Sequence, residues 1–164
     1  MNWKPTLSGI ALVTLLAAGS SLTWIAGNRS ADAHSGQVFA AGEPGDPAKP
    51  SRMVMLWFRD GPGTMTYAPD KIQVRAGEQI KFVLKNIGQL DHEFLLDSVE
   101  NNAKHKREMA KNPEMEHDDP NGKRLKSDET VELLWKFTKK GAFEFACLIP
   151  GHYESGMKGT VIVK

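Results

Sequence analysis

The sequence has 164 residues and a formal net charge of +1, because 21 Lys and Arg residues nearly balance 20 Asp and Glu residues. A chain without a basic excess lacks the electrostatic signature of a nucleic-acid-binding protein. With one cysteine it cannot form an internal disulfide. In an oxidising compartment such a free thiol needs another role, and metal ligation is one that protects it.

The first 33 residues predict a secretory signal peptide. They contain a short basic start at Lys4, an apolar run over residues 10–25 and a small-x-small site that ends at Ala33. We therefore expect cleavage after Ala33 and export to the periplasm. The apolar run is shorter than the ~20 residues of a membrane span, so an uncleaved N-terminal anchor is the alternative. The expected mature chain has no membrane span, and its 131 residues suffice for one domain.

Residues 34–51 are rich in Gly, Ala and Pro and predict a linker or an extended N-terminal segment, which precedes a domain over residues 52–164. Within that domain apolar and polar residues alternate with the period of β-strands. The alternating sets are Ile80, Phe82 and Leu84; Val131, Leu133, Trp135 and Phe137; and Phe143, Phe145 and Cys147. Glycine-containing turns separate these strands. The pattern predicts an all-β fold, a Greek-key β-sandwich.

The predicted strand over residues 53–58 is apolar on both faces. Its methionines, with Met65, are candidates for a soft-metal cluster, because thioethers bind copper. Met53 and Met55 share strand parity, however, and methionine is a common core filler. We therefore expect Met53 and Met55 to be core residues.

A loop near the C-terminus carries Cys147, His152 and Met157. Copper that cycles between two oxidation states is held by a thiolate and two imidazoles in a trigonal plane, with a weak thioether bond along the axis. Taken singly, a lone Cys or Met is an ordinary core residue, but together they supply three of these four ligands. Among five histidines, His92 lies in an apolar, strand-like stretch. The sequence thus predicts a mononuclear type 1 copper site of His92, Cys147, His152 and Met157.

The run from Phe145 to Gly159 resembles the ligand loop of the cupredoxins, the small blue copper proteins related to azurin and plastocyanin. Three further segments, residues 42–47, 92–94 and 115–121, are similar to the periplasmic copper-tolerance cupredoxins of bacteria, those of the CopI type. The resemblance covers nearly all of the chain after residue 40. It implies one copper ion that exchanges single electrons with little rearrangement.

The resemblance also implies that the ring edge of His152 reaches the surface and serves as the port for electrons, where a redox partner protein docks. The expected apolar collar around it comprises Leu148, Ile149, Pro150 and Met157. One departure follows the first histidine, where many cupredoxins have Asn or Ser and this chain has Glu93. An ionised carboxylate accepts N–H bonds but cannot donate, which affects colour and reduction potential rather than metal binding.

The segment 97–128 breaks the strand pattern, because it is highly charged and contains a helix-like stretch over residues 103–111. We interpret it as a helical insertion on the sandwich. The candidate ligands of a second, weaker copper site in this segment are His105, Met109, Met115 and His117. Their residue types are compatible with copper. The alternative is a solvated helix with ordinary surface histidines.

Three functions need a copper site of this kind. The first, favoured by the segments similar to CopI, is a periplasmic copper-tolerance protein that binds copper and buffers or oxidises it. The second is a diffusible electron carrier between respiratory or photosynthetic partners. The third is an enzyme such as a nitrite reductase or multicopper oxidase, but these enzymes need further histidine pairs and a longer chain. A binuclear copper centre is also excluded, because it needs two cysteines. We therefore expect a monomeric copper-binding protein that is not an enzyme.

Overall fold

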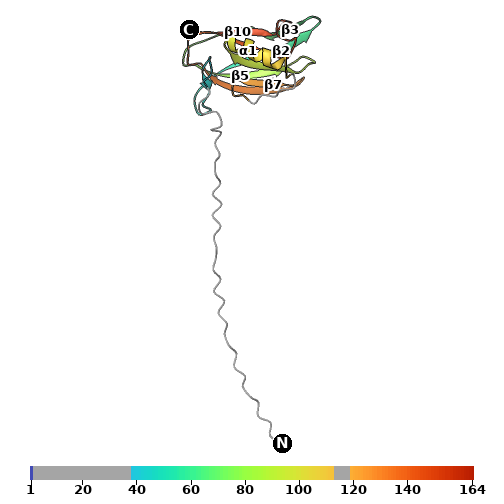
Figure 1. Cartoon of the computed structure of the whole chain (residues 1–164). Coiled ribbons are helices and arrows are strands. Elements are labelled where there is room, and N and C mark those ends of the chain that lie inside the picture. The colour runs from blue at the N-terminus through green and yellow to red at the C-terminus, as the bar shows by residue number, and fades with distance from the viewer. Residues whose placement is uncertain (2–37, 113–118) are drawn as a thin grey trace. The chain divides into compact units, whose positions relative to one another are not determined.

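The computed structural model describes Met1, residues 38–112 and residues 119–164. The predicted signal peptide and its cleavage site lie outside these described residues. Over the described part, the chain forms two five-stranded β-sheets and one helix (Figure 1). The elements are β1 (Glu43–Pro44), β2 (Arg52–Gly61), β3 (Thr64–Ala68), β4 (Lys71–Val74), β5 (Gln79–Asn86), β6 (His92–Asp97), α1 (Val99–Met109), β7 (Gly122–Leu125), β8 (Thr130–Lys136), β9 (Gly141–Ala146) and β10 (Lys158–Val163).

The first sheet has the strand order β1-β8-β5-β2-β3 and the second has the order β4-β10-β9-β6-β7. The chain crosses from one sheet to the other after β3, β4, β5, β7 and β8, so strands that are consecutive in sequence often lie in different layers. Two pairs are parallel, β2 with β5 and β4 with β10. The expected all-β sandwich is confirmed.

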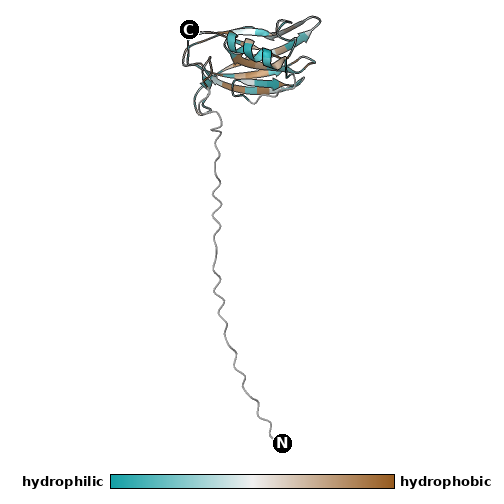
Figure 2. Cartoon of the chain, viewed as in Figure 1, coloured by the Kyte–Doolittle hydropathy of each residue, from teal (hydrophilic) through white to brown (hydrophobic). Residues whose placement is uncertain are grey.

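The core lies between the sheets and is built from one face of each strand. Ile80, Phe82 and Leu84 of β5 are fully buried, as their alternation predicts, and Trp135 of β8 is buried opposite Ile80. Aromatic rings continue the core toward the end of β9, where Phe145 stacks on a neighbouring phenylalanine of β6. Such ring pairs contribute about 0.5–1.5 kcal/mol beyond their buried area. Figure 2 shows the apolar residues along the strands and the largely hydrophilic surface of α1.

Strand β2 corrects one prediction. Leu56 is fully buried, whereas Met53 is 63% exposed and Met55 is 36% exposed. The two methionines point away from the core because they share the outer face of the first sheet with lysines of β5, and Met53 lies opposite Lys81. The expectation that Met53 and Met55 are core residues was therefore wrong.

Residues 38–51 contain the short strand β1 and a turn at residues 47–48, and they complete the sandwich. Phe39 and Ala41 are buried in the main core, and the ring of Phe39 meets that of Trp135 edge-on at 5.2 Å. Gly42 has a φ of 144°, and a Cβ there would lie 2.0 Å from the carbonyl oxygen of Lys136. Only glycine permits this close approach of two backbones.

Helix α1 lies within the segment 97–128 and starts earlier than predicted. Ser98 caps it, because its side-chain oxygen accepts the N–H of Asn101 at 3.1 Å. The helix carries mostly polar residues but buries Asn102 and Met109. No helix of the described residues combines the length and the hydropathy that crossing a membrane requires.

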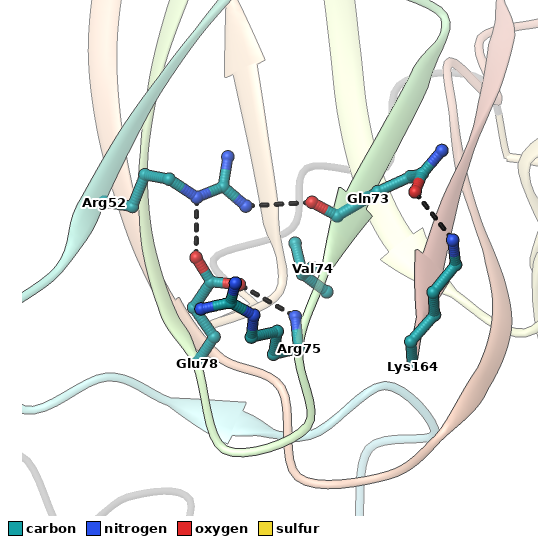
Figure 3. A pocket seen from close by; sticks show the side chains of 6 residues that line it. All are labelled: Arg52, Gln73, Val74, Arg75, Glu78 and Lys164. Carbon is teal, nitrogen blue, oxygen red and sulfur yellow. Dashed lines mark hydrogen bonds and ion pairs between the residues drawn. The ribbon is translucent and has the colours of Figure 1, made fainter.

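A pocket of about 420 Å³, lined mostly by charged and polar residue types, lies near the end of the sandwich opposite to Cys147 (Figure 3). Register places it there, because Val74 pairs with Val163, which pairs with the first residue of β9, and Cys147 follows the last. Arg52 donates to Glu78 at 2.6 Å and to the carbonyl of Gln73 at 2.9 Å. These bonds connect β2, β4 and the turn before β5 and hold this end together.

Candidate metal centre

Two neighbouring strands of the second sheet bring the predicted ligands together. His92 is the first residue of β6, and Cys147 directly follows the last residue of β9. The strands are antiparallel, with Leu95 opposite Ala146, so the start of one lies beside the end of the other. His152, 60 positions after His92, is returned to the same point by the loop that follows β9.

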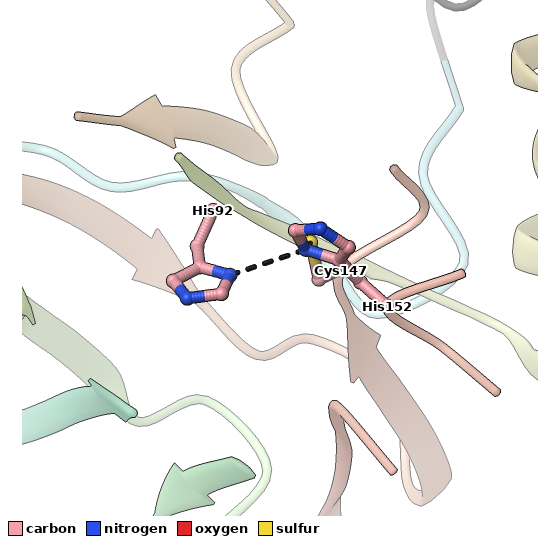
Figure 4. A group of neighbouring side chains, drawn as sticks. All are labelled: His92, Cys147 and His152. Carbon is pink, nitrogen blue, oxygen red and sulfur yellow. Dashed lines mark hydrogen bonds between the residues drawn. The ribbon is translucent and has the colours of Figure 1, made fainter. Parts of the chain in front are cut away.

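Three donor atoms converge at this point (Figure 4). Nδ1 of His92 lies 3.2 Å from Nδ1 of His152, and Sγ of Cys147 lies 3.3 Å from the same His152 nitrogen. All three atoms fall within 4.8 Å of one another. Three ligands in a trigonal plane, each about 2.0–2.3 Å from a divalent first-row ion, are separated by about 3.5–4 Å. The two measured separations are a few tenths of an ångström shorter than this, and the mixture of one thiol with two imidazoles suits copper.

The ligand loop is closed by its own backbone. The N–H of Cys147 donates to the carbonyl of Met157 at 3.1 Å, and the N–H of Met157 donates to the carbonyl of His152 at 3.1 Å. Gly151 and Gly156 have φ values of 90° and 102°, in the region that favours glycine. These bonds fix the backbone of the loop that carries the predicted ligands.

Exposure differs among the loop residues. Cys147 and Met157 are fully buried, and His152 is half-buried. The expected collar is therefore wrong for Met157 and for Leu148, which is only 1% exposed and belongs to a small apolar cluster beneath the loop. Of the four expected residues, Ile149 is half-buried and Pro150 is exposed.

Glu93 connects the two ligand segments. Its N–H donates to Sγ of Cys147 at 3.3 Å, and its Oε2 accepts the N–H of Leu148 at 3.3 Å. Its carbonyl accepts a hydrogen bond from the hydroxyl of Tyr67. The carboxylate thus acts as an acceptor between the loops, in agreement with the chemistry expected of a carboxylate at this position.

Burial sets the protonation of the metal-free site. It raises the pKa of the Cys147 thiol to about 12 and lowers the pKa of both His92 and His152. At neutral pH the thiol therefore keeps its proton while both imidazoles are neutral. Metal binding must displace the thiol proton.

We expect the stability of the apoprotein to depend on pH through Glu93. Burial raises the pKa of Glu93 from 4.5 to about 7, although the N–H of Leu148 acts in the opposite direction. Between these values the folded chain holds a proton that the unfolded chain has released, so stability falls as the pH rises. The shift corresponds to roughly 3 kcal/mol.

The Glu93→Gln protein has no ionisable side chain at position 93, so its stability should lack this pH-dependent contribution. Urea unfolding of both apoproteins at about pH 5 and about pH 8 measures it as the difference between the two proteins, in which contributions shared with the histidines cancel. Parallel changes in the two proteins would contradict the shifted pKa of Glu93.

Helix α1 supports the ligand loop from outside. Nζ of Lys106 donates to Glu154 at 2.8 Å and lies 4.5 Å from the centre of the Tyr153 ring. The Tyr153 hydroxyl donates to Glu144 at 3.0 Å, and Nδ2 of Asn102 donates to the same carboxylate at 3.1 Å. The residue after His152 is thus held by the helix and by β9.

The four candidate ligands of the second copper site have different environments. Met109 is 1% exposed and packs with Leu95, Ala146 and Leu148. His105 is half-buried and lines a pocket of about 270 Å³. Met115 and His117 lie outside the described residues. Because the side chains around Met109 are apolar, we assign Met109 a packing role.

Sequence reasoning assigned no role to two residues beside the site, Asp60 and Tyr67. Oδ2 of Asp60 lies 3.4 Å from Nε2 of His92, and the Tyr67 hydroxyl bonds to Glu93. Both residues belong to the first sheet, whereas His92 and Glu93 belong to the second. A contact across the sandwich leaves no periodic signal in the sequence.

A two-layer sandwich that gathers a thiol and two imidazoles at one end is the arrangement of small copper proteins. The sequence matches the copper binding proteins of the plastocyanin/azurin family over residues 57–164. The chain belongs to this family, the cupredoxins.

Two relatives of this chain are both copper-resistant cuproproteins named CopI. The copper-resistant cuproprotein CopI of Rubrivivax gelatinosus is 40% identical over 162 residues, which are 98% of this chain and 96% of that protein. CopI of Pseudomonas aeruginosa is 34% identical and covers 92% of this chain and 97% of its own. Among solved structures, auracyanin B has a TM-score of 0.59 and 21% identity, over 76% of this chain and 96% of its own. At 21% identity, this similarity shows that the two proteins share a fold and carries no further conclusion.

Proposed function

We propose that the chain binds one copper ion in a type 1 site, with His92, Cys147 and His152 in the plane and Met157 as the weak axial ligand. The convergence of three donor atoms within 4.8 Å supports this proposal most directly. The backbone hydrogen bond from Cys147 to Met157, at 3.1 Å, supports the choice of Met157 as the axial ligand. A thiolate, two imidazoles and a thioether suit copper in both of its oxidation states.

The copper ion supplies a one-electron Cu(II)/Cu(I) couple when it is bound. The chain determines how that couple is used. Burial of Cys147 keeps water and oxidants from its sulfur. The loop bonds hold the ligands, so electron exchange requires little rearrangement. His152 is the ligand that reaches toward solvent, and a redox partner protein is proposed to dock at its ring.

We assign this site to copper tolerance in the periplasm. The supporting observation is the near full-length likeness to two proteins named copper-resistant cuproproteins. Export is proposed to follow from residues 1–33, with removal after Ala33 to leave a monomeric single-domain protein. The intact mass of the purified exported protein should correspond to a chain that begins at His34. Retention of residues 1–33 in a membrane fraction would instead indicate an anchor.

Removal of the gene is expected to make cells sensitive to excess copper. A wild-type copy should restore growth, and a Cys147→Ser copy should not, because it lacks the thiolate. Growth curves across a copper series measure this effect. A growth defect confined to conditions that require electron transport, without copper sensitivity, would contradict tolerance and favour the electron carrier.

The second, weaker copper site at His105, Met109, Met115 and His117 stays a prediction. A ratio of bound copper to mature chain above one, lowered by His105→Ala, supports it. Our proposal for the type 1 site requires one copper per chain whatever the result at the second site.

A further inference from the structure

We propose that Asp60 is a positioning residue for the His92 ligand, selecting the imidazole tautomer that presents Nδ1 to copper and favouring Cu(II) through its charge. This inference rests on the proposed copper site. It assigns a role to a carboxylate from the opposite sheet that is not itself a ligand.

The carboxylate of Asp60 is held rigidly. The N–H of Gln89 donates to both of its oxygens at 2.9 Å, and the N–H of Leu90 donates to Oδ2 at 2.8 Å. A Cβ at Gly88 would lie 2.5–2.7 Å from the carboxyl atoms. The segment that leads into His92 therefore lies against Asp60, and a side chain at position 88 would have to displace the carboxylate.

The charge of this carboxylate is maintained. The N–H groups of Gln89 and Leu90 donate to this carboxylate, and such bonds favour its charged form. Asp60 is therefore ionised at neutral pH. Its side chain is 10% exposed.

The two ring nitrogens of His92 have different neighbours. Nδ1 faces Nδ1 of His152 at 3.2 Å. Nε2 is buried and has no well-formed hydrogen bond within the described residues. Oδ2 of Asp60 lies 3.4 Å from it, beyond the usual 2.7–3.2 Å of an N–H···O bond. The contact therefore acts chiefly through charge.

A neutral imidazole carries its proton on one nitrogen only. A negative charge beside Nε2 favours the tautomer with the proton there, which leaves the lone pair of Nδ1 for a metal. Carboxylates beside the outer nitrogen of a metal-binding histidine orient the ring and raise its basicity. The same charge stabilises the more positive Cu(II) state relative to Cu(I).

Asp60→Asn tests the proposal, because it keeps an oxygen for the loop N–H groups and removes the charge. Asp91→Asn is the matched control. It neutralises an acid next to His92 in sequence, but one that is 44% exposed and 3.7 Å from Arg124. Thermal unfolding of each apoprotein checks that the fold is retained.

Two measurements are decisive. Nitrogen NMR of the apoprotein should place the His92 proton on Nε2 in wild type and in Asp91→Asn, and Asp60→Asn should shift the population toward Nδ1. In Asp60→Asn the affinity for Cu(II) should fall about 10–100-fold, with a smaller loss for Cu(I). Each tenfold difference between the two losses raises the reduction potential by about 59 mV. Asp91→Asn should change affinity by about twofold.

An unchanged tautomer and an unchanged potential in Asp60→Asn overturn the proposal and leave Asp60 as a loop anchor. Should that variant fail to fold, Gly88→Ala decides, because its Cβ displaces the carboxylate while the charge remains in the chain. Wild-type tautomer and potential in a folded Gly88→Ala protein overturn the proposal equally. The NMR measurement needs no copper, so failure of wild type to bind copper would reject the proposed function separately.

Discussion

Cys147→Ser is expected to abolish the intense visible absorption of the Cu(II)-loaded protein. That absorption arises from charge transfer between a thiolate sulfur and copper, and Cys147 is the only cysteine of the chain. Serine is similar in size and fits the fully buried position, but its hydroxyl is a harder donor that does not ionise at neutral pH. Absorption spectra of wild type and variant, taken with one equivalent of Cu(II), measure the loss.

Met157→Leu is the control for this experiment. Leucine preserves the apolar volume in the core and removes only the weak axial thioether, so the band should remain. The reduction potential should rise, because the thioether modestly favours Cu(II). A wild-type complex without colour, at full copper occupancy, would reject the type 1 assignment.

Met109→Ala is expected to lower the free energy of unfolding by about 2–5 kcal/mol. Met109 is 1% exposed and fills the cluster between α1 and the ligand loop with Leu95, Ala146 and Leu148. Truncation leaves a cavity beneath Leu148, which follows the copper-binding cysteine in sequence. Urea unfolding of the apoprotein at neutral pH measures the loss.

Met109→Leu separates packing from metal binding at the same position. It keeps the volume and removes the sulfur, so it should cost less than about 1.5 kcal/mol and bind as much copper as wild type. A stable Met109→Leu protein that binds less copper would identify Met109 as a ligand of the second site. It would also contradict the packing role that we infer from its burial.

The proximity of Cys147 and His152 was predictable because both lie on one loop, where their spacing is visible in the sequence. His92 followed from its apolar, strand-like surroundings, and β6 does begin at that residue. The side chains around the ligands were less predictable. Asp60 reaches His92 only because β2 and β6 face each other across the sandwich, and neither strand carries a signal of the other.

Strand faces were predictable where one face is polar. In β5 the outer face carries Lys81 and Lys85, and the buried face of Ile80, Phe82 and Leu84 was predicted correctly. Residues 53–58 are apolar at every position, so alternation could not distinguish the two faces. Lys81, which pairs with Met53 across the β2–β5 pair, identifies the outer face, and that pairing is a tertiary property.

Met53 is exposed whereas Met109 and Met157 are buried, and this difference has a consequence for oxidative damage. Oxidation to the sulfoxide turns an apolar methionine into a polar one. Met53 is 63% exposed on the outer face of the first sheet and can keep the new oxygen in water, whereas Met109 and Met157 would have to bury it. Oxidants in the solvent should therefore react with the exposed Met53 before they react with the buried Met109 and Met157.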